Sequence, residues 1–343
     1  MPVHQPVMVK EALVGLNCRP GRLYVDGTVG EGGHAAAILD CSRPDGRLWG
    51  LDRDPAVLKA AATRLARHTS RFQLFHQSYC QLGDLLATAH LEGVAGILLD
   101  LGLSSRQLQT SQRGFSFWGD EPLDMRFDPE NGESITAAQL LNSAPEAELA
   151  RIFYEYGQEP RARRLARVIV QARRRQPFRT TQQLVDVSKQ AMGPGWRRGR
   201  LHPATRVFQA LRIAVNRELE EIATFLEQAP GWLEGGGRLV VIAYHSLEDR
   251  LVKEKMAAWD RAGVMARLTR KPLTPTPEEV AGNPRARSAK MRIAEKINPS
   301  NWEEAHVSKN RQKPEPRGKA REFPRQPHGN CPGWLLSVHP ALG

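Results

Sequence analysis

Short apolar strands alternate with helices over the first hundred residues of this chain, and no other feature limits its fold as strongly. The predicted strands are bounded by glycine, proline or acidic residues and cover residues 22–29, 46–51, 72–75 and 94–99. The helices predicted between them cover residues 33–40 and 55–67, and Pro55 suits a first helical position. This alternation is typical of α/β proteins and predicts a parallel sheet with helices on both faces.

Helical patterns replace the strands between about residues 104 and 202. They cover residues 136–141, 145–156, 161–175 and 181–192. A long amphipathic helix is then predicted over residues 205–227, because apolar side chains recur there at every third or fourth position. Strand patterns return at residues 238–244 and 288–297, and the second of these strands is expected to bury one face.

These patterns predict a discontinuous sheet domain. Residues 1–105 and 206–297 are expected to form that domain, and residues 106–205 an inserted all-α domain. Residues 298–343 are polar and basic and contain prolines, so we expect them to form a mostly disordered tail.

Positive charge is concentrated in one part of the chain. The 343 residues include 49 Lys+Arg and 37 Asp+Glu, which gives a net charge of +12. Residues 161–220 contain 15 basic and 3 acidic residues, so this segment alone carries +12. Most of these basic residues are arginines, whose planar side chains suit phosphate groups, so the segment indicates a surface that binds a polyanion. A solvated helix face is the alternative interpretation.

Several other classes of protein are disfavoured. The apolar runs are far shorter than the roughly 20 residues that a membrane-spanning helix needs, and the N-terminus lacks the pattern of a secretory signal. The four cysteines form no Cys-x-x-Cys pair, which argues against a disulfide framework and fits a reducing, cytoplasmic location. The histidines show no ligand spacing, so no metal is expected.

A glycine-rich turn follows the first predicted strand. The residues Gly30-x-Gly32-x-x-Ala35 match a loose dinucleotide-binding pattern. This match is weak on its own, because an ordinary tight turn also requires glycine.

Three acidic residues stand at the ends of predicted strands and make the ligand more specific. Asp26 precedes the glycine-rich turn, Asp52 ends the second strand and Asp100 ends the fourth. Ligands of open α/β sheets bind at this carboxyl edge, where a carboxylate can accept hydrogen bonds from ribose hydroxyls. Each residue alone could be a helix cap or a surface charge. Together they predict a nucleoside that also carries a cationic amine, as S-adenosylmethionine does.

Seven longer motifs occur in order along the chain. They are Glu31-Gly32-Gly33-His34, Asp100-Leu101-Gly102-Leu103-Ser104-Ser105, Arg113-Gly114-Phe115-Ser116-Phe117, Pro122-Leu123-Asp124-Met125-Arg126, Thr205-Arg206-Val207-Phe208-Gln209-Ala210-Leu211-Arg212, His245-Ser246-Leu247-Glu248-Asp249-Arg250 and Asn283-Pro284-Arg285-Ala286-Arg287-Ser288-Ala289-Lys290. With these motifs, residues 4 to about 297 resemble the bacterial small-subunit ribosomal RNA cytosine-N4 methyltransferases, the RsmH or MraW family.

The resemblance implies a class I, Rossmann-like methyltransferase sheet with an inserted helical domain. It implies methylation, by S-adenosylmethionine, of the exocyclic N4 amine of one cytidine near the decoding centre of 16S rRNA. The residues implied for the cofactor are Gly32, Gly33 and His34 at its amino-acid end, Asp52 at its ribose, Tyr79 beside its adenine, Asp100 at its methionine or adenine edge, and Gln107 to complete the pocket. Ala35 and Ala243-Tyr244 depart from the commoner family residues at peripheral positions.

The reaction asks the protein to align donor and acceptor for an in-line displacement. Cytosine N4 is a poor nucleophile, because its lone pair is delocalised into the ring. A hydrogen-bond acceptor for the N4 hydrogens would help to localise that lone pair. The catalytic candidates are Asp100, Ser104 with its neighbour Ser105, and His245. Ser104 also suits a helix N-cap, and His245 a packing role, so the choice among them stays open.

The substrate base must leave its stack to react. The arginine-rich segment and a strand containing Lys290 and Arg292 are expected to face the RNA. The candidate RNA-binding residues are Arg164, Arg197, Arg198, Arg200 and Arg206, and Trp196 suits either stacking on a base or anchoring its loop. The expected partner is 16S rRNA within the small ribosomal subunit, and formation of a homodimer is left open.

Three rival functions remain. A nicotinamide-dependent oxidoreductase would share the glycine-rich turn and Asp52, but Asp26 and the arginine-rich segment argue against it. A non-catalytic RNA-binding assembly factor would not need the full set of pocket carboxylates. The third rival is a DNA or protein methyltransferase. Only the family resemblance favours an RNA methyltransferase over it.

Overall fold

The computed structural model describes residues 6–68, 70–109, 111–130, 132, 134–193 and 202–298. These residues belong to one compact unit. No helix within these ranges is long and apolar enough to cross a membrane. Residues 299–343 of the predicted tail, and the predicted RNA contacts Arg197, Arg198 and Arg200, lie outside the described residues.

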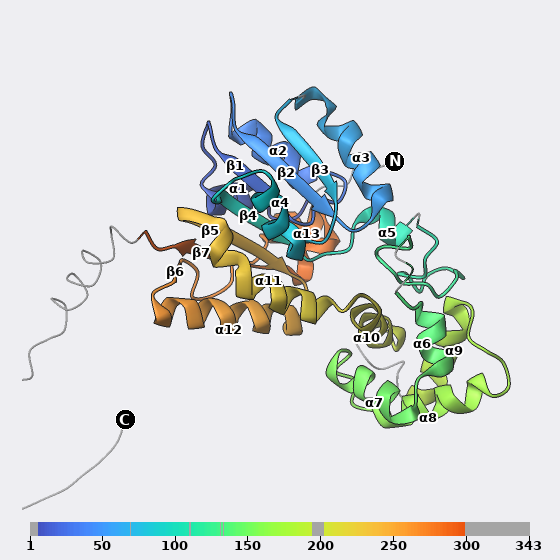
Figure 1. The fold of residues 1–343 in the computed structure, drawn as a ribbon. Helices are drawn as coiled ribbons and strands as arrows, with labels where there is room; N and C mark the ends of the chain where they lie inside the picture. Colours follow the sequence, from blue (N-terminus) through green and yellow to red (C-terminus); the bar gives the residue numbers. More distant parts are fainter. Residues whose placement is uncertain are drawn as a thin grey trace, which may run out of the picture. The chain divides into compact units, whose positions relative to one another are not determined.

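One seven-stranded sheet runs through the described part of the chain, in the order β3-β2-β1-β4-β5-β7-β6 (Figure 1). Its strands are β1 (Leu23–Asp26), β2 (Arg47–Asp52), β3 (Phe72–His76), β4 (Val94–Asp100), β5 (Leu233–Ala243), β6 (Met265–Arg267) and β7 (Lys290–Lys296). The strands β1 to β5 are parallel, whereas β7 is antiparallel to both of its neighbours. The predicted α/β class is therefore confirmed, but a wholly parallel sheet is wrong at the β7 edge, because side-chain alternation carries no information about strand direction.

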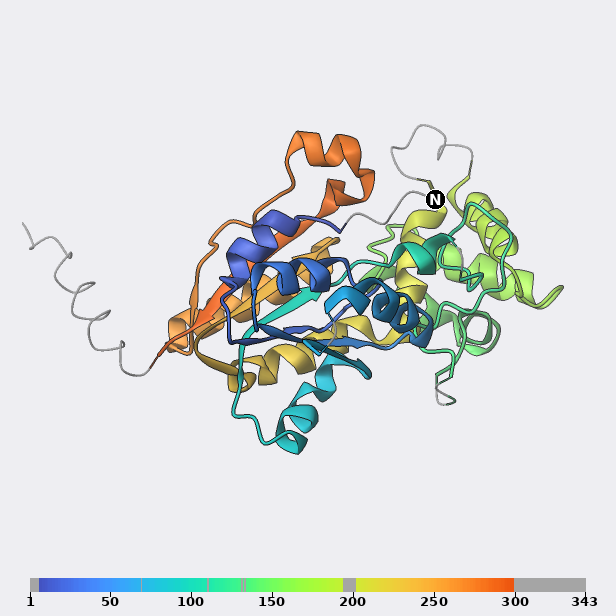
Figure 2. The ribbon, with the colours of Figure 1, turned by 90° about the horizontal axis from the view of Figure 1, so that it is seen from above.

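Helices cover both faces of the sheet (Figure 2). They are α1 (Val9–Leu16), α2 (Gly33–Cys41), α3 (Pro55–Leu65), α4 (Leu82–Thr88), α5 (Ser105–Gln109), α6 (Ala137–Ser143), α7 (Glu146–Glu155), α8 (Ala162–Arg173), α9 (Thr181–Met192), α10 (Ala204–Asn216), α11 (Glu218–Trp232), α12 (Ser246–Ala262) and α13 (Pro277–Gly282). One buried cluster joins α1, α2 and α3 to the sheet through Leu16, Ile38 and Leu65. A second cluster joins α4, α11 and α12 to the opposite face through side chains such as Phe225 and Met256.

A third apolar cluster is formed by α6 to α10. It includes Leu141, Phe153, Leu165 and Leu184, with Phe208 and Leu211 contributed by α10. The amphipathic patterns predicted for this region are present as helices, because each helix turns its apolar stripe inward. The division of the chain into a sheet domain and an inserted helical domain stays a prediction, and α10 packs with the helices rather than with the sheet.

The predicted long helix over 205–227 is wrong, because the structure has two helices there. Arg217 adopts a left-handed conformation with φ of 52°, which ends α10 and begins α11. Asn216 at the end of α10 donates to the carbonyl of Met125 and accepts from the backbone N–H of Phe127, both at 2.7 Å. Both helices are amphipathic, so the apolar periodicity continues across the break and conceals it.

The strand β5 begins earlier than predicted, at Leu233 rather than residue 238. Its register against β4 shifts between Val94 and Gly96. A Cβ on Gly237 would lie 2.9 Å from the carbonyl oxygen of Glu234 and 3.0 Å from that of Val94. Glycine therefore allows this irregular strand start, although a run of three glycines reads as a turn in the sequence.

Candidate functional site

The glycine-rich turn after β1 brings backbone to the carboxyl edge of the sheet. Gly30 and Gly32 have φ angles of +51° and +79°, a region that favours glycine. Gly32 also forms the N-cap of α2. The turn is fastened from the next strand, because the carboxylate of Asp52 accepts the N–H of Gly30 at 2.9 Å.

A cavity of about 420 Å³ lies beside this turn. Asp52 and Asp100, at the ends of β2 and β4, line it together with His34. Asp26 ends β1, which lies between those two strands, but it is only 1% exposed and does not line the cavity. The structure thus brings the three predicted acids to one edge, with Asp26 behind the cavity wall.

Asp26 is electrostatically unusual. Burial raises its pKa to about 7, and the nearby charges of Asp100 and Asp52 act in the same direction, while His34 and the N–H of Thr28 oppose them. One carboxylate oxygen accepts from Thr28 at 3.3 Å. The other is buried and has no hydrogen-bond partner among the described residues. A buried acceptor without a partner is costly, so Asp26 suits a ligand that brings a donor.

Asp52 is held by its own turn. One of its oxygens binds Gly30, and the other accepts the N–H of Asp54 at 2.9 Å. Burial raises the pKa of Asp52 to about 6, and these backbone donors limit the rise.

Asp100 is held by the loop that follows it. Its Oδ1 accepts from the N–H of Gly102 at 3.3 Å, and the hydroxyl of Tyr244 also binds its carboxylate. Nδ1 of His34 lies 3.7 Å from Oδ2. The Nε2 of His34 lies 2.8 Å from the carbonyl oxygen of Val7, which can only accept, so Nε2 carries a hydrogen.

Three further predicted residues line the same cavity. Tyr79 packs edge-on against Phe225, with ring centroids 5.4 Å apart, and so presents a rigid aromatic wall. Gln107 is buried, and its amide nitrogen lies 3.4 Å from Oδ2 of Asp54. The Oγ of Ser104 accepts the N–H of Gln107 at 3.1 Å, which is the helix-capping interaction that competes with a catalytic role.

The opposite wall of the cavity comes from the helical region. The side chains of Phe117, Phe208, Gln209 and Arg212 line it. The cavity therefore lies between the glycine-rich turn and α10, and Arg212 is the arginine in the described part of segment 161–220 that lines it.

The predicted RNA-facing residues are placed differently from one another. Arg164 is exposed on α8, and Arg206 is partly exposed on α10 at 3.9 Å from Glu159; neither lines the cavity. Arg292, expected on an RNA-facing strand, is instead 4% exposed and bonds Asp249 at 2.7 Å. That expectation is wrong for Arg292, because β7 is covered on the side that the alternation assigned to solvent.

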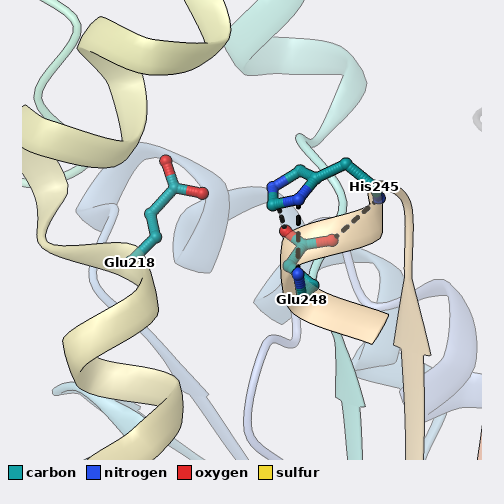
Figure 3. Close-up of side chains that lie close together, drawn as sticks. All are labelled: Glu218, His245 and Glu248. Atoms are coloured by element: carbon teal, nitrogen blue, oxygen red, sulfur yellow. Dashed lines mark hydrogen bonds and ion pairs between the residues drawn. The ribbon is translucent and has the colours of Figure 1, made fainter. Parts of the chain in front are cut away.

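Figure 3 shows a group of three side chains that line the cavity, Glu218, His245 and Glu248. His245 and Glu248 come from one sequence motif, and Glu218 lies outside it. One ligand atom from each lies within 4.8 Å of the others, a spacing that a metal ion could use. Nε2 of His245 lies 3.0 Å from Oε1 of Glu248. The other carboxylate oxygen of Glu248 accepts the backbone N–H of Tyr244.

Arg212 already neutralises the third member of this group. Its guanidinium bonds both oxygens of Glu218 at 2.8 Å. Burial raises the pKa of Glu218, and Arg212 opposes that rise. A cation at this place would have to compete with the guanidinium for Glu218.

Several lining or supporting residues carry no role in the sequence interpretation. Asp54 caps α3 through the N–H of Ala56 and also binds the guanidinium of Arg113, which comes from the 111–127 loop. Glu248 stands three residues after His245, the spacing of a capping box, and this signal was present in the sequence. The pairing of Asp54 with Arg113 spans 59 positions and leaves no such local signal.

The fold and the cavity together define an α/β protein of the Rossmann-like class, with its crevice at the carboxyl edge where the strand order reverses. The model of the MraW methylase family matches residues 1–297. The chain belongs to this family.

Curated relatives agree with this membership. The ribosomal RNA small subunit methyltransferase H of Geobacter sulfurreducens is 49% identical over 309 residues, covering 86% of this chain and 99% of that protein. The protein of the same name from a Cyanothece species is 48% identical over 297 residues, covering 86% of this chain and 95% of its own length.

Solved structures are more distant. A putative rRNA-methylase from Clostridium thermocellum is 13% identical with a TM-score of 0.41, covering 86% of this chain and 100% of its own. A putative methyltransferase from Streptococcus mutans in complex with SAH is 10% identical with a TM-score of 0.37, covering 86% and 99%. Likeness at this level does not define function.

Proposed function

We propose that this protein uses S-adenosylmethionine to methylate the exocyclic N4 amine of a cytidine in 16S rRNA, near the decoding centre. The observation that carries the proposal is the cavity itself. Its floor holds Asp52, Asp100 and His34, and its opposite wall is made by α10. Family membership and the names of the curated relatives support the choice of ribosomal RNA over other methyl acceptors.

The residues present fit the proposed cofactor. The buried oxygen of Asp26 lacks a partner and lies behind the part of the wall that Gly27 and Thr28 line, so an ammonium group seated against this turn would be attracted by its charge. Gly32, Gly33 and His34 are proposed at the amino-acid end, Asp52 at the ribose and Tyr79 beside the adenine. Gln107 would complete the pocket. When bound, the cofactor supplies a methyl group on a positively charged sulfur.

The protein's own contribution is alignment and hydrogen bonding. Tyr79 and the glycine-rich turn would fix the donor, and α10 would limit the approach of the base, so the displacement can proceed in line. Asp100 is proposed to accept a hydrogen bond from N4, since its carboxylate lies on the cavity wall and only one of its oxygens receives a backbone N–H. His245 is the second candidate, as a group that positions the base: its Nδ1 accepts the backbone N–H of Glu248 and its Nε2 faces the carboxylate of Glu248, so neither nitrogen is free to accept from N4. Ser104 is the weakest, because its hydroxyl oxygen caps a helix.

The remaining proposals concern setting and partners. We propose that residues 106–205 recognise the substrate, that Arg164 and Arg206 contact RNA phosphates, and that the small ribosomal subunit in the cytoplasm is the working partner. No resident metal is proposed, because Arg212 already holds Glu218 in the group that has ligand spacing.

The proposed function is tested by methyl incorporation. Small ribosomal subunits from cells that lack this protein are incubated with the purified chain and tritiated S-adenosylmethionine, and 16S rRNA is then mapped by mass. We expect one cytidine to gain one methyl group on N4. Incorporation into ribosomal protein instead, or none at all, would contradict the proposal.

The arginine-rich segment yields a separate prediction. Changing Arg197, Arg198 and Arg200 together to alanine should weaken RNA binding and flatten its salt dependence, since fewer counterions are released. For a single strand the slope of log affinity against log salt should fall by up to about 2. Anisotropy titrations over a range of salt concentrations measure this, and cofactor affinity should not change.

A matched triple variant tests whether location matters. Lys10, Arg250 and Lys253 are exposed basic residues outside residues 161–220, and their joint change to alanine removes the same charge. An equal flattening in both triple variants would mean that only net charge is sensed, which would contradict the assignment.

A further inference from the structure

Trp118 is the most exposed of the large apolar side chains that remain exposed in the described residues. Its side chain is 86% exposed, on the loop that follows the motif ending in Phe117. Exposing an indole ring to water costs hydrophobic free energy, so this position is not explained by packing within the fold.

Trp118 is the outer member of a row of rings that leads into the cavity. Its ring centroid lies 5.4 Å from that of Phe117 and 6.3 Å from that of His202. Phe117 and His202 are stacked, with centroids 4.9 Å apart and planes 12° from parallel. Phe117 then meets Phe208 edge-on, and both of these side chains line the cavity.

The inner rings hold their places through contacts that the outer ring lacks. Phe208 is 5% exposed within the cluster formed by α6 to α10, and Phe117 packs against that cluster. The pKa of His202 is lowered, by partial burial and by the charge of Lys189, so its ring is neutral at pH 7 and offers an aromatic surface. The row therefore has a fixed inner end and a solvent-facing outer end.

Electrostatics around the row favours a polyanion over an apolar partner. Lys189 acts on His202 at the end of α9, and Arg206 follows His202 by four positions on α10. Segment 161–220, which contributes His202 and Phe208 to the row, carries a net charge of +12. The two acids that follow Trp118 are occupied by backbone donors: Asp120 accepts the N–H of Gln182, and Glu121 accepts the N–H of Gly114. An exposed ring beside basic groups is the combination that binds single-stranded nucleic acid, where bases stack on aromatic side chains.

We propose that Trp118 is a base-stacking subsite that holds an unpaired RNA base next to the nucleotide that enters the cavity. The inference rests on the proposed function, since an RNA strand that places one base in the cavity has its neighbouring bases close by, and Phe117, which lines the cavity, contacts Trp118. Trp118 stacks on one such base and so keeps the strand open at that point. It does not touch the cofactor or the reacting atoms.

The test compares Trp118→Ala and Trp118→Phe with the unaltered full-length chain. Methyl transfer is measured on small subunits that lack the modification, and binding is measured by anisotropy on a short, labelled single-stranded oligoribonucleotide. The alanine variant should raise KM for the subunits and Kd for the oligonucleotide by about 5- to 100-fold. The phenylalanine variant should restore most of the loss, and kcat and cofactor affinity should stay the same.

Two further readings separate stacking from other roles. Stacking releases no counterions, so Trp118→Ala should leave the salt slope unchanged, unlike loss of an arginine. Tyr154→Ala is the matched control, because Tyr154 is 69% exposed on α7 and does not line the cavity, and it should bind as the unaltered chain does.

Each outcome bears on one proposal. If the unaltered chain methylates rRNA and Trp118→Ala matches it in both KM and Kd, the stacking subsite is wrong while the proposed function stands. If the unaltered chain does not methylate rRNA, the proposed function fails, and the oligonucleotide titration still decides whether Trp118 stacks on a base. Equal losses in Trp118→Ala and Tyr154→Ala would indicate a general effect of surface aromatic residues and would overturn the subsite.

Discussion

Asp100→Ala is expected to reduce methyl transfer by about 10²- to 10⁴-fold, the usual contribution of a positioned proton acceptor. Asp100 lies on the cavity wall at the end of β4, where its carboxylate meets the N–H of Gly102 and the hydroxyl of Tyr244. The measurement is a tritiated-methyl assay on small subunits under saturating cofactor. The fold should survive, because the side chain is partly exposed and packs in no apolar cluster.

Two variants sharpen this test. Asp100→Asn keeps an oxygen that can accept a hydrogen from N4, so it should retain more activity than the alanine variant. Asp84→Ala removes an exposed carboxylate on α4 and should leave turnover unchanged. Normal turnover by Asp100→Ala would contradict the assignment of Asp100 as the acceptor.

Asp26→Asn is expected to make the protein more stable and its cofactor binding weaker. The gain in stability is expected because the pKa of Asp26 is raised, to about 7 in the folded chain from an ordinary 3.8. Between these two values the folded state binds more protons than the unfolded state, so stability falls as pH rises and stays reduced above pH 7. Asparagine carries no charge, so the variant should gain up to about 4 kcal/mol in unfolding free energy at pH 8.

The binding half of this prediction uses the same group. Asp26 lies behind the cavity wall, so its ionised carboxylate would attract the ammonium of the proposed cofactor through that wall. The affinity of the unaltered chain for S-adenosylhomocysteine should therefore fall as pH drops below about 7, where Asp26 takes up a proton. Calorimetry at pH 8 should show at least about a tenfold loss for Asp26→Asn, as expected when a charged partner is lost. Asp84→Asn is the control, and an Asp26→Asn protein that is less stable yet binds normally would exclude this role.

Much of the fold could be predicted because its cause is local. Each strand from β1 to β4 is a short apolar run with a helix or a turn after it, and Pro55 and Gly32 mark the helix starts where the structure has them. The break at Arg217 could not be predicted in this way. It depends on hydrogen bonds from Asn216 to a segment about 90 positions earlier, and the apolar period runs through it unchanged.

Parts of the candidate site could likewise be predicted from local sequence, and other parts depend on the tertiary structure. Asp52 and Asp100 were found because strand ends share an edge of the sheet, and both line the cavity. The burial of a side chain at a strand end cannot be predicted from the sequence. The position of Asp26 behind the cavity wall is therefore visible only in the structure. The same holds for the row of rings at Phe117, whose members come from two segments separated by more than eighty positions in the chain.

The placement of α10 has a practical consequence for anyone who dissects this protein. Phe208 and Leu211 are buried among the preceding helices, whereas Phe225 of α11 is buried against the sheet. Excising residues 106–205 would remove the apolar partners of α10. The side chains of α10 would then form an exposed apolar surface that promotes aggregation. A deletion that ends at Arg217, between the two helices, would keep each set of buried apolar side chains whole, so it suits a minimal sheet body. It also removes Gln107 and Arg212, which line the cavity, so that body should not be catalytic.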